Sequence, residues 1–166
     1  VHVAEDLADV EDAKRRGYAG PFERLLTLGA LPAGSILAHG VHLDAAQVRQ
    51  AAAAGLWLVQ NPRSNEGNRV GYPGALAESS NVAVGTDGYP ADMTVEHAAL
   101  ERLAREHADA GLARLGERIG GGARLARERF GDDAITPPPI APEELERIRR
   151  RAREEAARLW PRMLAQ

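Results

Sequence analysis

The side chains best suited to chemistry in this chain lie at or just beyond short apolar segments. His2 and Glu5 stand three residues apart in VHVAED, His39 closes SILAH, and Asp87 follows NVAVGT. Imidazole nitrogens and carboxylate oxygens both suit Zn²⁺ or Fe²⁺ as ligands. A carboxylate near such an ion, but not bound to it, is suited to carrying protons. These residue types and their places after apolar segments indicate a metal site built from distant parts of the chain.

Four short apolar segments must position these residues, and we predict strands at 1–4, 35–38, 56–60 and 81–85. Helical segments alternate with them; these are 21–28, 44–54 and 73–78, with a more irregular segment at 6–16. Apolar strands that alternate with helices are typical of a parallel α/β sheet. The polar residues fall at the carboxyl ends of the strands, where ligands bind in such sheets.

Four motifs resemble, in order, those of the amidohydrolase superfamily: HVAE at 2–5, ILAHGVHLD at 36–44, VQNPRSNEGNRVG at 59–71 and VAVGTDGYPADM at 82–93. Within that superfamily they look closest to the aminohydrolase and deaminase branch, which includes guanine deaminase, chlorohydrolase-type enzymes and SsnA-like aminohydrolases. The resemblance covers about residues 1–93. It implies a (β/α)8 TIM barrel, of which this chain carries strands five to eight, with further helices at the C-terminal end.

The resemblance also implies a role for each motif residue. His2 is the expected metal ligand of the fifth strand, and Glu5 the proton shuttle. His39 is expected beside the metal, orienting the attacking water. Asp87 is expected to bind the metal and to accept a proton. The cofactor implied is one divalent metal ion, zinc in the first place and iron as the alternative.

The reaction implied is deamination of a nitrogen heterocycle by attack of a metal-bound hydroxide. Two other readings stay open on the same scaffold. One is hydrolysis of a C–Cl or amide bond, and the other is a non-catalytic, truncated half barrel. The family also carries an H-x-H pair after its first strand, and this sequence contains no H-x-H. We therefore expect the chain, which opens at Val1, to be the C-terminal part of a longer enzyme and to be inactive alone.

Three further residues are candidates for binding a small-molecule substrate. These are His42, Asn61 and Arg63, and the planar donor fork of Arg63 suits a carboxylate, a phosphate or a ring carbonyl. Asn61 to Asn65 are expected to form a loop after the third strand. Within that loop, Ser64 and Asn65 are expected to bond the loop's own backbone, as such side chains commonly do.

Composition excludes several classes of function. The net charge of −3 gives no electrostatic reason to expect nucleic-acid binding. The chain has no cysteine, so thiolate metal sites and disulfides are excluded. No apolar run approaches the roughly 18 residues of a membrane span. We expect a cytoplasmic protein that binds no membrane and forms a homodimer, because four strands with open edges favour association.

The C-terminal part differs in character. Helices are expected at 94–115 and 123–130, separated by three glycines. The predicted division is a barrel half at 1–131, a proline-rich linker at 132–142 and an amphipathic helix within 143–166. The apolar stripe of that helix is expected to pack on the body of the protein.

Overall fold

The computed structural model describes residues 1–135 and 140–164. These form two compact units, 1–125 and 126–166, each of which is described by itself. The predicted linker falls in the second unit, and its prolines at 137–139 lie outside the described residues. The predicted boundaries at 131 and 142 stay predictions.

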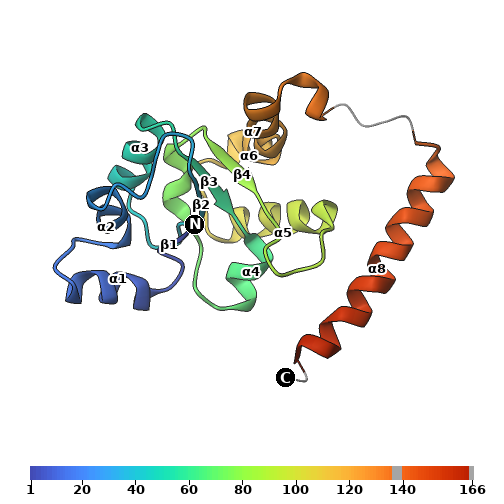
Figure 1. Ribbon diagram of the computed structural model, residues 1–166, viewed down its shortest axis with the longest axis horizontal. Coiled ribbons are helices and arrows are strands. Elements are labelled where there is room, and N and C mark those ends of the chain that lie inside the picture. The colour runs from blue at the N-terminus through green and yellow to red at the C-terminus, as the bar shows by residue number, and fades with distance from the viewer. Residues whose placement is uncertain (136–139, 165–166) are drawn as a thin grey trace. The chain divides into compact units, whose positions relative to one another are not determined.

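A four-stranded parallel sheet is the centre of the first unit (Figure 1). Its strands, β1 (His2–Val3), β2 (Ile36–His39), β3 (Trp57–Gln60) and β4 (Val82–Val84), lie side by side in chain order. Parallel strands in sequence order, joined by helical connections, confirm the predicted α/β class. All four carboxyl ends therefore meet at one edge of the sheet.

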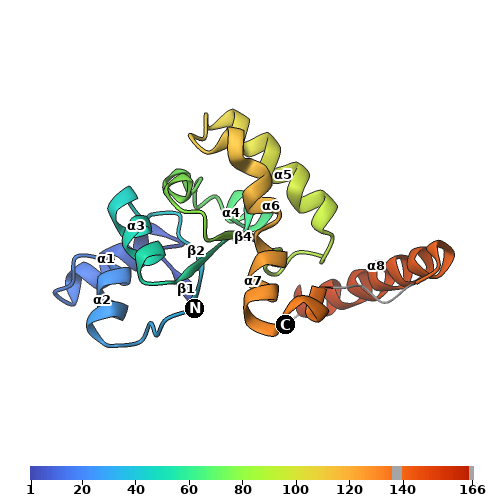
Figure 2. The ribbon, with the colours of Figure 1, turned by 90° about the horizontal axis from the view of Figure 1, so that it is seen from above.

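Helices alternate with the strands, as the sequence predicts. Between β1 and β4 they are α1 (Leu7–Arg15), α2 (Pro21–Thr27), α3 (Ala45–Ala53), α4 (Pro62–Gly67) and the 3-10 helix η1 (Gly74–Glu78). After β4 come α5 (Met93–Glu106), the 3-10 turn η2 (Leu112–Arg114), α6 (Leu115–Ile119) and α7 (Gly121–Phe130). Seen from above, α1 to α3 lie near β1 and β2, while α5 and α6 lie near β4 (Figure 2).

One face of the sheet forms the main core. Leu37, Leu58 and Val82 are neighbours across three strands, and none of them is accessible to solvent. They pack with Phe22 of α2 and Val48 of α3 in one cluster. Burial of a side chain of this size contributes about 1.5–3 kcal/mol, so this cluster fixes the sheet on which the polar strand ends stand.

Two segments expected to be irregular are helical instead. The segment 6–16 contains α1, because Asp6 and Asp9 form a reciprocal capping box at its start. Most of the loop expected at 61–65 belongs instead to α4, which begins with Pro62 as its first residue and extends to Gly67. Proline there has a backbone φ already suited to a helix and no N–H to leave unpaired. A helix of six residues is too short to show a clear apolar period in the sequence.

The expected helix at 94–115 is interrupted. It ends at Glu106, and Ala108 adopts a left-handed φ of 49° in the turn that follows. The helix expected at 123–130 starts two residues earlier, because α7 begins at Gly121 and therefore includes two of the three glycines expected to precede it. A Cβ at Gly121 would collide with the carbonyl oxygen of Val82, so glycine lets α7 approach β4 closely.

A buried ion pair between Asp109 and Arg118 holds the segments after α5 together. Their side chains are 0% and 5% exposed, and Arg118 Nη1 lies 2.7 Å from Asp109 Oδ2. Burial alone would raise the pKa of Asp109, but hydrogen bonds from Arg118, Tyr72 and the Gly111 backbone hold it below its usual value. Burial and the hydrogen bond to Asp109 raise the pKa of Tyr72 to about 12.

We expect Arg118→Ala to lower the free energy of unfolding by about 3–5 kcal/mol, because it leaves a buried carboxylate unpaired. Arg105→Ala is the matched control, since Arg105 is 67% exposed in its pair with Glu101. That change should cost less than about 1 kcal/mol. Urea unfolding of both variants measures these two changes. Equal decreases in the free energy of unfolding would show that the buried pair stabilises the fold no more than the exposed one.

The second unit contains the end of α7, the 3-10 helix η3 (Asp132–Ile135) and α8 (Pro142–Leu164). α8 covers most of the range expected for the amphipathic helix, and Pro142, expected in the linker, is its first residue. On its apolar stripe, Leu145 and Ile148 are exposed. The packing of this stripe on the body stays a prediction. Among the described residues, no helix is both long and apolar enough to cross a bilayer.

Candidate metal centre

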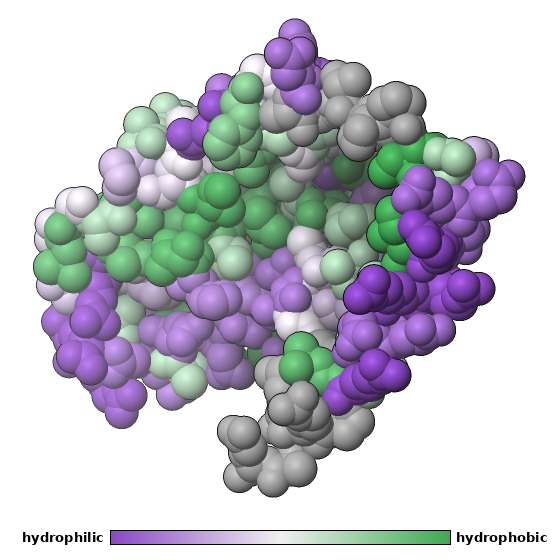
Figure 3. Space-filling view, turned by 45° about the vertical axis from the view of Figure 1, so that its right-hand side comes forward, coloured by the Kyte–Doolittle hydropathy of each residue, from purple (hydrophilic) through white to green (hydrophobic). Residues whose placement is uncertain are grey.

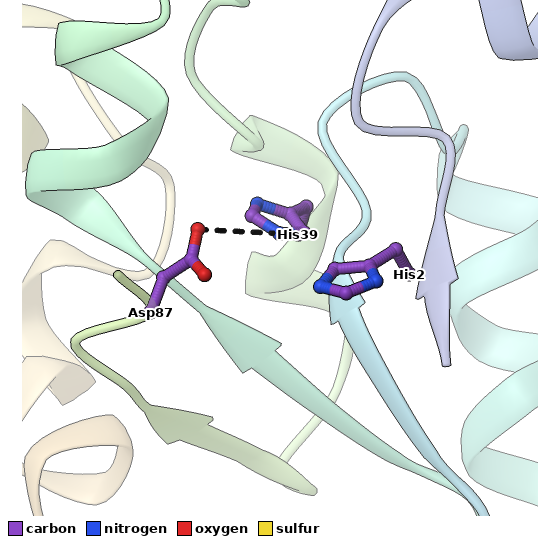
Figure 4. Close-up of side chains that lie close together, drawn as sticks. All are labelled: His2, His39 and Asp87. Atoms are coloured by element: carbon purple, nitrogen blue, oxygen red, sulfur yellow. Dashed lines mark ion pairs between the residues drawn. The ribbon is translucent and has the colours of Figure 1, made fainter. Parts of the chain in front are cut away.

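His2, His39 and Asp87 come together at the carboxyl edge of the sheet (Figure 4). Each offers one nitrogen or oxygen atom, and these three atoms lie within 4.8 Å of one another. The residues come from β1, from the end of β2 and from the loop after β4, so they are 37 to 85 positions apart along the chain. The geometry brings together the histidines and the aspartate that the motifs single out.

Three residues at or just beyond strand ends adopt left-handed backbone near this cluster. Ala4, His39 and Asp87 have φ values of 49°, 71° and 48°. Such values are uncommon for residues other than glycine, and they recur at functional sites, where surrounding structure enforces them. Here the turn at Ala4 is fixed by its carbonyl, which accepts a hydrogen bond from the His42 backbone N–H at 3.0 Å.

His39 is almost completely buried, and each of its ring nitrogens has a different environment. Nδ1 lies 2.8 Å from Asn65 Oδ1. Nε2 lies 3.5 Å from Glu5 Oε2 and 3.8 Å from Asp87 Oδ2. The first distance is within hydrogen-bonding range for N–H···O, and the other two are beyond it. Because an amide oxygen only accepts, the Asn65 contact is a hydrogen bond when Nδ1 carries the ring proton.

The two carboxylates are each held by a donor from α4 or its C-terminal cap. Ser64 Oγ donates to Asp87 Oδ2 at 2.6 Å. Asn68 Nδ2 donates to Glu5 Oε1 at 3.2 Å, which leaves Oε2 of Glu5 on the side of His39. Glu5 and Asp87 remain partly open to solvent, with 25% and 32% of their side chains exposed. Both are therefore accessible to water and to a ligand.

The predicted substrate-binding residues occupy three different settings. Asn61 is buried against His39, with its amide nitrogen 3.4 Å from both ring nitrogens. Gly85 makes room for it, because a Cβ there would lie 2.7 Å from Asn61 Oδ1. His42 is half-buried in the turn after β2. It is not among the three residues that the structure groups as candidate ligands.

Arg63 points its donors toward α5 and the loop after Asp87. Its guanidinium pairs with the buried Glu96, and Nη2 donates to the Pro90 carbonyl at 2.7 Å. It also lies over the ring of Tyr89, 5.3 Å from the centroid. The guanidinium donors of Arg63 are thus bonded to groups of the protein itself, and the role of Arg63 in substrate binding stays a prediction.

The contacts of Ser64 and Asn65 differ from the expectation that they bond their own loop. Ser64 bonds Asp87, Asn65 bonds His39, and Asn68, which is not among the predicted site residues, bonds Glu5. The signal that could have found them is their spacing. Positions 61, 64, 65 and 68 share one face of a helix. That signal is invisible while the segment is taken for a loop.

A pocket of about 260 Å³ lies on another side of α4. Tyr72 and His107, whose rings stack 4.7 Å apart, form part of its wall, together with Pro62, Glu66 and Arg69 of the α4 region. None of His2, His39 and Asp87 lines it. The candidate metal centre is therefore separate from this pocket, and Asn65 is the residue that touches both.

The donor set of the cluster fits a divalent metal ion. Two imidazole nitrogens and one carboxylate oxygen are ligands that zinc and iron both accept, and a catalytic zinc uses about three protein ligands. The sequence offered two ligands, His2 and Asp87, with His39 beside them. The structure adds His39 Nε2 as a third candidate ligand atom.

Comparison with known proteins identifies relatives of part of the chain. No protein-family model matches it. It is 33% identical over 107 residues to a 5-methylthioadenosine/S-adenosylhomocysteine deaminase of Moorella thermoacetica, covering 63% of this chain and 25% of that protein. It is 35% identical over 91 residues to a 5'-deoxyadenosine deaminase of Methanopyrus kandleri, covering 53% and 21%. The chain thus spans a quarter or less of the length of these relatives.

A solved structure matches a larger part of the chain. It is an adenosine deaminase from Xanthomonas campestris with bound zinc, 29% identical, with a TM-score of 0.67. The match covers 79% of this chain and 32% of that one. The relatives and this structural neighbour are all deaminases of the amidohydrolase type. They confirm that the chain resembles the deaminase branch of the amidohydrolase superfamily, as its four motifs indicate.

Proposed function

We propose that the chain forms the C-terminal half of the barrel of a metal-dependent aminohydrolase, which deaminates an adenine-type nitrogen heterocycle. The observation that carries this proposal is the convergence of His2, Glu5, His39 and Asp87 at one edge of a parallel sheet. The names of the relatives and of the zinc-bound neighbour support the substrate class and zinc as the metal. The four strands correspond, in this proposal, to strands five to eight of the barrel.

His2 and Asp87 would hold the metal, with His39 Nε2 beside it. When bound, such an ion lowers the pKa of a water molecule enough to make it a nucleophile near neutral pH. Asp87 would accept the proton that the water gives up as it attacks the ring carbon. Glu5 would carry protons from the attacking oxygen and Asp87 to the ring nitrogen and the leaving amine, so that the protons of the water end on the two products. His39 orients the attacking oxygen through Nε2.

An adenine-type ring needs this proton carrier because attack at its amino-bearing carbon pushes electrons onto a ring nitrogen. A carboxylic acid within reach of that nitrogen keeps it from becoming an anion. Asn68 holds one oxygen of Glu5, and the other oxygen points toward the cluster. Glu5 is therefore placed to give protons to both the ring nitrogen and the leaving amine. This arrangement is the reason to prefer deamination over simple amide hydrolysis.

The rest of the barrel is proposed to come from another part of a longer protein or from an associated chain. Apolar residues at the start of β1 and β2 support this. Val1 and Ile36 are 61% and 41% exposed. Figure 3 shows that apolar residues also reach the surface elsewhere on the visible face of the molecule. Where the rest of the barrel is not present, two copies of this chain would cover these residues instead, and this is the proposed basis of a homodimer.

The test is product analysis on a longer protein that contains this chain together with an H-x-H strand end. Adenosine, 5'-deoxyadenosine and 5-methylthioadenosine are supplied, and ammonia is measured. We expect ammonia release with zinc present, and none from the 166-residue chain alone. Chloride from a chlorinated heterocycle, or a new carboxylate, would point to the alternative hydrolases instead. Gel filtration with metal analysis of the short chain completes the test, because a monomer with stoichiometric zinc would contradict the half-site proposal.

A further inference from the structure

One short helix supplies the partners of three candidate catalytic groups. Asn61, Ser64, Asn65 and Asn68 lie at helical spacing and face the carboxyl edge of the sheet. Three of them bond groups on three separate segments: Ser64 bonds Asp87, Asn65 bonds His39, and Asn68 bonds Glu5. The arrangement of the site therefore depends on where α4 is placed.

Charged contacts fix α4 from its other side. The backbone N–H of Arg63 donates to Glu96 Oε1 at 2.9 Å, and its guanidinium pairs with the same fully buried carboxylate. Arg102 of α5 adds a contact to Glu66 at 2.7 Å. Together these contacts join α4 to α5. Asn65 is thus presented to His39 from a helix anchored at its first turn.

The Asn65 contact has a chemical consequence that packing alone does not have. Neutral imidazole carries its proton on one nitrogen and a lone pair on the other, and the hydrogen bond of one nitrogen decides which. Asn65 Oδ1, at 2.8 Å from Nδ1, is the acceptor close enough to hold that proton. The carboxylate oxygens of Glu5 and Asp87 are 3.5 Å and 3.8 Å from Nε2, too far to compete with it.

We propose that Asn65 is a positioning residue that holds His39 in the Nδ1–H tautomer, so that the lone pair of Nε2 faces Glu5 and Asp87. Only this tautomer lets Nε2 bind a metal ion or accept a hydrogen bond from water. Asn65 itself is 2% exposed, and its Nδ2 has no hydrogen-bond partner within the described part of the chain. The use of this lone pair in catalysis rests on the proposed function, whereas the tautomer does not.

Nitrogen-detected NMR of the His39 ring in the 166-residue chain tests this directly. The measurement is made without metal, at a pH where the imidazole is neutral. We expect Nδ1–H in the unaltered chain. Asn65→Leu, which is similar in size but has no acceptor, should shift the ring toward the Nε2–H form that histidine favours in water. Asn65→Asp keeps the acceptor and should restore Nδ1–H.

Asn81→Leu serves as the control, because Asn81 lies at the start of β4, at the opposite end of the strands. It should leave the His39 ring unchanged. Backbone amide spectra show whether each variant is folded. If Asn65→Leu does not fold, the ring of the unaltered chain decides, because the proposal requires Nδ1–H there. The proposal is overturned if the His39 ring is in the Nε2–H form in the unaltered chain, or if its tautomer does not change in Asn65→Leu.

A second readout separates this proposal from the proposed function. In the proposed longer enzyme, Asn65→Leu should lower kcat about 10–100-fold, the usual effect of losing a residue that orients the groups around a metal. KM should change little, because Asn65 acts on His39 and not on the substrate. Asn65→Asp should recover part of that loss. If the enzyme deaminates nothing while the tautomer responds as expected, the function is wrong and the positioning role stands. If the enzyme deaminates but the tautomer does not respond to Asn65→Leu, the proposed function stands and the positioning role of Asn65 is wrong.

Discussion

Replacing Glu5 with glutamine is expected to lower the turnover of the proposed longer deaminase by about 10²–10⁴-fold, the usual contribution of a positioned acid–base group. Glutamine keeps the shape of the side chain and can still contact Asn68, but it cannot carry a proton between the nucleophile, the ring and the leaving amine. Glu5 is not one of the three candidate ligands, so zinc content should not change. Ammonia release and metal analysis on the same preparation measure both effects.

Glu11→Gln is the matched control, because Glu11 is an exposed carboxylate of α1 and should change neither quantity. A Glu5→Gln enzyme with full turnover would remove the proton shuttle from the mechanism. Loss of zinc in the same variant would instead make Glu5 a metal ligand. The two results are separable because turnover and metal content are measured independently.

His2→Ala is expected to reduce the zinc of the longer enzyme to background and to abolish turnover with it. Catalytic zinc sites use about three protein ligands, and removal of one leaves the ion weakly held. His2 comes from the short strand β1, whose position is fixed by pairing with β2 rather than by the imidazole. The fold should therefore survive the change. Elemental analysis after dialysis gives the zinc content, and circular dichroism checks the fold.

His107→Ala is the control for His2, since His107 is exposed and stacks on Tyr72 outside the cluster. It should keep full zinc and full turnover. Zinc that persists in His2→Ala would mean that the ion is held elsewhere, and the assignment of β1 as a ligand-bearing strand would fail.

The sheet and its order could be predicted because each strand is a short apolar run followed by a polar residue. Leu37, Leu58 and Val82 are buried in one row, and such runs are easily read from a sequence. The convergence of His2, His39 and Asp87 follows from this order, since parallel strands bring their carboxyl ends to one edge. Thus the candidate site could be expected in outline.

The contacts that shape the site could not be predicted in the same way. Whether Ser64 bonds its own loop or Asp87 depends on the few residues that make α4 a helix, and those residues show no apolar period. The partner of Arg63 is Glu96, 33 residues later, and nothing local links the two. Long-range polar pairs depend on tertiary geometry, which a single sequence does not reveal.

The left-handed backbone at the strand ends has a consequence for attempts to engineer this protein. L-residues in that conformation cost roughly 1–2 kcal/mol each, a cost that glycine avoids. Two of the three positions, His39 and Asp87, are candidate catalytic residues, so the most conformationally relaxed replacement at each is also the one that removes the chemistry. Laboratory selection for thermal stability alone would therefore favour glycine at these positions and yield a more stable but inactive protein. Selection for activity would keep the strained left-handed backbone at the strand ends that carry the site.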